Sequence, residues 1–183
     1  MMMSIEKDFL STAIRRLKYY KELSEKTFDQ LEDKDLHFQA SSESNSIAVI
    51  VQHMAGNMLS RWTNFLTEDG EKSWRQRDDE FEIHQYSKQQ IIDLWQKGWD
   101  CFFQALESLT EDDLLKTIHI RQEPLTVVDA INRQLAHYPY HIGQIVFIGK
   151  MISNENWKSL SIPKNRSQAY NNSNEVKDPA KKY

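Results

Sequence analysis

Two of the six histidines in this 183-residue sequence have a spacing that could hold a metal ion. His137 and His141 are four residues apart in the segment LAHYPYHIGQI. On a helix, this spacing puts both side chains on one face, one turn apart. Two imidazoles in that position can share one divalent ion. The same spacing also fits two ordinary polar positions or two core histidines, so the pair alone does not define a site.

A third imidazole can come from His53, in the segment IAVIVQHMAGNMLSRW. This histidine lies beside an apolar stripe, where a single histidine is usually a core or boundary residue. In a bundle, however, its helix would face the helix of the histidine pair, and the three rings could converge. Three imidazoles with no evident fourth protein ligand would leave a position open for water or substrate. That arrangement is typical of a catalytic metal site.

Pro139 lies between His137 and His141, inside an otherwise continuous helical pattern. A proline there removes a backbone donor and leaves the carbonyl of Leu135 without its helical partner, at a cost of about 3 kcal/mol. A residue that is unfavourable in its local secondary structure, as this proline is in a helix, can mark a functional site. It is equally compatible with a plain structural kink.

Four polar residues near the three histidines are candidates for a substrate contact or a supporting hydrogen bond. Asn57 and Gln134 each lie about one turn from a histidine on the same predicted helix. Arg61 and Arg133 could recognise an anion near the site. The alternative for each arginine is a solvated or paired surface position, which is commoner. His37, His84 and His119 fall in polar or extended segments and are predicted at the surface, although the last two could belong to loops that fold over the site.

Several other kinds of protein are disfavoured. The residues between His137 and His141 are Tyr, Pro and Tyr, so the HExxH signature of zinc peptidases is missing, and no Glu-x-x-His pair of a di-iron bundle occurs. Phosphate-binding glycine loops and nucleophile elbows are missing too. A net charge of −4, from 23 basic and 27 acidic residues, argues against nucleic-acid binding.

The compartment expected for the protein is the cytoplasm. The apolar runs are far shorter than the roughly 20 residues that cross a bilayer, so we expect no membrane partner. The N-terminal residues do not resemble a secretion signal. The one cysteine, Cys101, cannot form a disulfide within the chain and is expected to be a buried, inert thiol.

Apolar residues at spacings of three and four predict the helices that would position the histidines. The stripes run over residues 4–31, 46–66, 87–109 and 126–149, with capping residues at Ser46, Ser87 and Thr126. Trp62, Trp95 and Trp99 fall on these stripes as core residues. With only 5 Gly and 4 Pro in the chain, we predict an all-α fold, a four-helix bundle.

The connections and the end of the chain differ in character. The segment 68–85 between the second and third helices is charged, aromatic and long, so it is expected either to carry a function, such as capping the site, or to wrap the surface. Residues 110–125 predict a short helical turn and then an extended excursion. We predict one metal-binding domain over residues 1–165 and a polar, poorly ordered tail over 166–183.

The segments IVQHMAGNMLSRW and QLAHYPYHIGQI resemble those of the DinB/YfiT-like superfamily of metal-binding four-helix bundles, over about residues 4–160. FLTEDGEKSWRQRDDEF and SIPKNRSQAYN are similar to segments of a mostly uncharacterised branch of it. The resemblance implies that His53, His137 and His141 bind one divalent metal with open coordination. Characterised members include S-transferases that use bacillithiol or mycothiol and a maleylpyruvate isomerase. The resemblance also implies that the metal lowers the pKa of a bound thiol.

Three functional hypotheses follow. The first is a metal-dependent thiol S-transferase in detoxification or stress response, with Zn²⁺ or Ni²⁺ as the ion, a small-molecule substrate and a thiol such as bacillithiol. The second is a metal-dependent hydrolase in which the ion activates water. The third is a non-enzymatic, metal-stabilised ligand-binding protein. A homodimer is expected in each case, because amphipathic bundles often leave an apolar strip that a twofold partner covers.

Overall fold

A side-chain oxygen caps the first turn of each of the four long helices. A computed structural model describes residues 4–183 and contains helices α1 (Ile5–Phe28), α3 (Ile47–Trp62), α4 (Lys88–Glu107) and α5 (Val127–Ser153). The oxygens that accept backbone N–H groups there belong to Ser4, Ser46, Ser87 and Thr126. Because the cap satisfies an N–H that has no intrahelical partner, it fixes where each helix begins.

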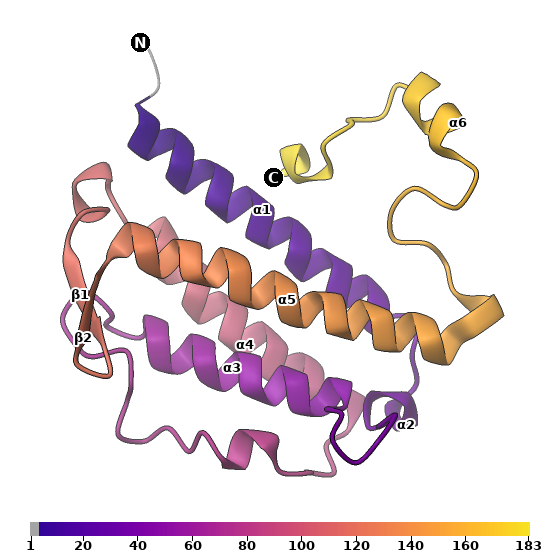
Figure 1. The fold of residues 1–183 in the computed structure, drawn as a ribbon, viewed down its shortest axis with the longest axis horizontal. Helices are drawn as coiled ribbons and strands as arrows, with labels where there is room; N and C mark the ends of the chain where they lie inside the picture. The colour runs from indigo at the N-terminus through magenta and orange to yellow at the C-terminus, as the bar shows by residue number, and fades with distance from the viewer. Residues whose placement is uncertain (1–3) are drawn as a thin grey trace.

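The four helices pack as a bundle, which confirms the predicted all-α class (Figure 1). The most extensive contacts join α3 to α4 and α1 to α5, and α5 also packs on α3. Gly98 lets α3 and α4 approach closely, since a side chain there would meet the Cα of Ala55 at 3.0 Å. The largest fully buried side chains include Phe28, Trp95, Trp99, Phe102 and Tyr138.

Short elements connect the long helices. The polar connection after α1 contains one helical turn, α2 (Asp33–Leu36). The long loop between α3 and α4 contains a 3₁₀ turn, η1 (Asp79–Phe81), and a second one, η2 (Glu111–Asp113), follows α4. The predicted extended excursion is an antiparallel hairpin of β1 (Thr117–Ile120) and β2 (Glu123–Thr126). Its two turn residues, Arg121 and Gln122, have positive φ, although neither is Gly or Asn.

Helix α5 continues through Pro139 without interruption. This continuity matters for the site, because His137 and His141 lie on either side of the proline. The helix thus keeps the two histidines four residues apart on one helical face.

After α5 the chain forms η3 (Asn154–Asn156), α6 (Ser167–Asn172) and η4 (Pro179–Lys182). Figure 1 shows this segment leaving the end of α5 and returning toward α1. There, η4 packs on α1, and Asp178 pairs with Arg16. The boundary at residue 165 and the poor order of the tail stay predictions. None of the helices within residues 4–183 has the length and apolar character needed to cross a membrane.

Candidate metal centre

Three imidazole rings converge where α3 faces α5. His53 comes from α3, and His137 and His141 come from α5. The Nε2 atom of His137 lies 3.4 Å from that of His53 and 3.1 Å from that of His141. All three rings offer a ligand atom within 4.8 Å of one another. The structure therefore brings together the three histidines that the sequence singles out.

The opposite nitrogen of each ring has its own hydrogen-bond acceptor. Nδ1 of His53 donates to Oε2 of Glu80 at 3.0 Å. Nδ1 of His137 donates to Oε1 of Gln134 at 3.4 Å, and Nδ1 of His141 donates to Oε1 of Gln144 at 2.8 Å. Because a neutral imidazole carries one N–H, these three bonds leave every Nε2 with a free lone pair.

The inward-facing lone pairs fit a cation. Two acceptor nitrogens 3.1 to 3.4 Å apart have no hydrogen to share, so they repel each other unless a positive charge lies between them. Nitrogens bound to a tetrahedral Zn²⁺ at 2.0–2.1 Å would lie about 3.3 Å apart. Second hydrogen bonds from Nδ1 to a carboxylate or carbonyl oxygen are usual for histidines that bind metal. The donor set therefore fits a divalent ion.

The environment keeps the imidazoles of His137 and His141 neutral at neutral pH. Burial lowers the pKa of His137 to about 4, and the charges of His141, His53 and Arg133 act in the same direction. Burial also lowers the pKa of His141 and outweighs the opposing hydrogen bond to Gln144. Since only the neutral ring can bind a metal, both histidines are in the form that binds.

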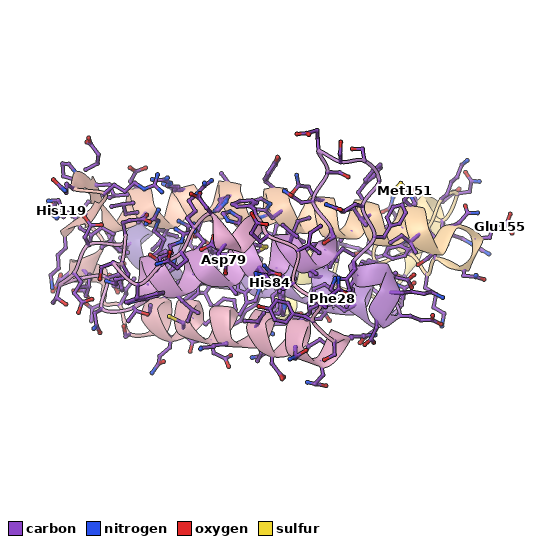
Figure 2. All side chains as sticks on the ribbon, turned by 90° about the horizontal axis from the view of Figure 1, so that it is seen from below. Phe28, Asp79, His84, His119, Met151 and Glu155 are labelled. Carbon is purple, nitrogen blue, oxygen red and sulfur yellow. The ribbon has the colours of Figure 1, made fainter. Side chains whose placement is uncertain are left out.

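The loop between α3 and α4 reaches this site through Glu80, which sequence analysis did not single out. Its carboxylate accepts from His53 and forms two hydrogen bonds with Arg75, at 2.7 and 2.9 Å. Burial opposes ionisation of Glu80, but the bonds from His53 and Arg75 hold its pKa below the usual range. Figure 2, viewed from the loop side, shows the neighbouring Asp79 near the middle of the molecule and His119 at one end. The loop thus supplies a buried carboxylate, paired with Arg75, beside His53.

The four polar candidates occupy different surroundings. Gln134 is buried and contacts His137. Arg133 is exposed, one turn before His137, and its charge acts on that ring. Asn57 accepts a hydrogen bond from the buried hydroxyl of Tyr138. Arg61 bonds to the carbonyl of Gly70 and to Glu71. The hydrogen bonds of Asn57 and Arg61 thus go to partners other than the three histidines.

The other chemically active residues lie outside the cluster. Nε2 of His37 bonds to the carbonyl of Tyr86, His84 stacks on the ring of Tyr86, and His119 is exposed on β1. Cys101 is half-buried on α4 and contacts Thr63 at the C-terminal end of α3. Gln144, like Glu80, was missed by sequence analysis, although its position three residues after His141 could have indicated it.

The fold is that of a DinB-like helical bundle. The crystal structure of a DinB-like protein from Bacillus cereus ATCC 10987 matches with a TM-score of 0.59 and 18% sequence identity, covering 77% of this chain and 91% of that chain. The chain belongs to the protein family of unknown function DUF1572, whose model matches residues 4–166. No curated protein matches the sequence. The predicted resemblance to the DinB/YfiT-like superfamily is confirmed at the level of the fold.

Proposed function

We propose that this protein binds one divalent metal ion through His53, His137 and His141 and acts as a thiol S-transferase on a small electrophile in the cytoplasm, in detoxification or stress response. The observation that supports the metal site best is the direction of the lone pairs. The three Nδ1–H groups donate to acceptors outside the cluster, and the three Nε2 atoms face one another. Zn²⁺ and Ni²⁺ are the proposed ions, since imidazole suits both.

An ion in this site would lower the pKa of a thiol or water bound beside the imidazoles. The thiol has to come from outside the chain. The only cysteine in the sequence is Cys101, whose contact is with Thr63 rather than with a histidine. We therefore propose a free low-molecular-weight thiol, such as bacillithiol, as the second substrate.

Two features of the chain support a substrate position at the site. His137 and His141 are only partly buried, so the side of the cluster formed by α5 is partly exposed to solvent. Arg133 is exposed one turn from His137 and forms no ion pair within the described residues 4–183. Its free positive charge would attract an anionic group on the thiol or the electrophile.

The reaction can be tested with the zinc- or nickel-loaded protein, bacillithiol and a haloaryl probe. The thiol sulfur would bond to the aryl carbon, the halide would leave with its electron pair, and the thiol proton would pass to the buffer. We expect product to form faster than in the uncatalysed mixture, and Arg133→Ala to slow it while retaining the metal. Hydrolysis of ester probes without thiol transfer would support the hydrolase instead. If the metal-loaded protein turns over neither class of probe, the result would support the third hypothesis, a non-enzymatic, metal-stabilised binding protein.

We also propose a homodimer. The outer face of α5 exposes Tyr140, Phe147 and Met151, which lie on one side of the helix at spacings of seven and four residues. An exposed apolar strip of this kind can be covered by a second copy of the chain. Light scattering over a range of protein concentrations is expected to give the mass of a dimer, and Phe147→Glu the mass of a monomer. A monomer mass for the unmodified protein at every concentration would contradict the proposal.

A further inference from the structure

We propose that Glu80 is the positioning residue of His53, and that its carboxylate couples metal binding to the docking of the α3–α4 loop, residues 63–87, on the bundle. This inference rests on the proposed metal site. It concerns how the chain prepares His53 for an ion, rather than which reaction follows.

The carboxylate of Glu80 is fully engaged and buried. One oxygen, Oε2, accepts from Nδ1 of His53 at 3.0 Å and from Nη2 of Arg75 at 2.9 Å, and Oε1 accepts from Nε of Arg75 at 2.7 Å. The side chains of His53 and Glu80 are each 9% exposed, and that of Arg75 is 2% exposed. An ionised carboxylate can only accept, so it fixes the proton of His53 on Nδ1 and turns Nε2 toward the other histidines.

Helix α3 has a recess for this carboxylate at Gly56. A Cβ atom at this position would lie 2.2 Å from Oε1 of Glu80 and 2.6 Å from its Cδ, closer than two such atoms can approach. Gly56 follows His53 by three residues, so the recess and the imidazole lie on one face of the helix. The glycine is therefore explained by the approach of Glu80.

Two more contacts hold the same turn of the loop on α3. The Nε2 group of Gln52 donates to the backbone carbonyls of Glu80 and Glu82, at 3.4 and 3.3 Å. The ring of Phe81 lies 4.9 Å from the ring of His53. The turn η1 is thus docked around one metal-binding histidine, although 27 residues of sequence separate Glu80 from it.

Docking and metal binding should therefore reinforce each other. The ring of His53 differs from the other two, because its Nδ1 partner is a carboxylate and theirs are amide oxygens. An ion on Nε2 makes the Nδ1–H group a stronger donor, which strengthens its bond to Glu80. By linkage, a docked Glu80 must raise the affinity for the ion by the same factor by which the ion favours docking.

The test compares zinc affinity, measured by competition with a chromophoric chelator, across matched variants. Losing a hydrogen-bond partner of a metal-binding histidine typically costs about 10- to 100-fold in affinity. We expect losses of this size for Glu80→Ala and for Gly56→Ala, which changes no polar group, and a smaller loss for Glu80→Gln, which keeps an acceptor. The control Gly143→Ala, on α5, has no atom within 4 Å of the added Cβ and should retain the original affinity.

A second measurement needs no metal. Nitrogen NMR of the imidazoles in metal-free protein should show His53 with its proton on Nδ1, and a mixture of tautomers in Glu80→Ala and Gly56→Ala. Circular dichroism identifies any variant that does not fold, in which case Glu80→Gln and Gly56→Ala give the result. Unchanged zinc affinity and unchanged His53 tautomer in these variants would overturn the inference. If the unmodified protein took up no zinc, the proposed function would fail, while the tautomer measurement would still decide the role of Glu80.

Discussion

His141→Ala is expected to lower the affinity of the protein for zinc or nickel by more than about a hundredfold. That value is the upper end of the loss seen when only an outer hydrogen-bond partner of a ligand is removed. His141 contributes one of three inward-facing nitrogens, and two imidazoles hold a divalent ion far less tightly than three. Activity in the thiol-transfer assay is expected to disappear with the metal.

The matched control for this variant is His119→Ala. His119 is exposed on β1 and lies outside the cluster, so its loss should leave the affinity unchanged. Equilibrium dialysis of both variants against the metal gives the comparison. Equal affinities in His141→Ala and His119→Ala would mean that the ion binds elsewhere.

Trp99→Ala is expected to lower the free energy of unfolding by about 3–5 kcal/mol, as is usual when a large aromatic side chain is removed from a core. Trp99 is fully buried on α4. Its ring lies 5.2 to 5.7 Å from those of Trp95, Phe102, Phe103 and Tyr138. Since the ring of Tyr138 also lies 5.5 Å from that of His137, only one side chain would separate the cavity from the histidine cluster.

Urea denaturation of the metal-free protein measures this effect. Trp74→Ala is the control, because Trp74 is 54% exposed and its replacement should cost about 0.5 kcal/mol or less. If the two variants lost the same stability, Trp99 would not be the core residue that its burial indicates.

The bundle could be predicted because its signals are local. Ser46, Ser87 and Thr126 cap helices at the expected positions, and apolar residues at helical spacing mark the faces that pack. For the hairpin, the sequence predicts only an extended excursion. Its turn residues, Arg121 and Gln122, both have positive φ without being Gly or Asn, so no turn signature was available.

The convergence of the histidines could also be predicted, since His137 and His141 lie one turn apart and helices in a bundle must face one another. The role of Glu80 could not be predicted from the sequence. It lies in an aperiodic charged loop, and its link to His53 depends on a tertiary contact that no spacing in the sequence encodes. The contact of Gln134 with His137 could be predicted, because both residues are on α5 and lie about one turn apart.

The measurement that tests the metal site most directly is the metal content of the purified protein. It is followed by titration with Zn²⁺ and Ni²⁺ at neutral pH, after a chelator has removed the metal from the protein. We expect one divalent ion per chain in the native protein, re-uptake of one ion after chelation, and none in His53→Ala. A protein that is purified without metal and takes up neither ion would contradict the site. Full uptake by His53→Ala would contradict the assignment of its ligands.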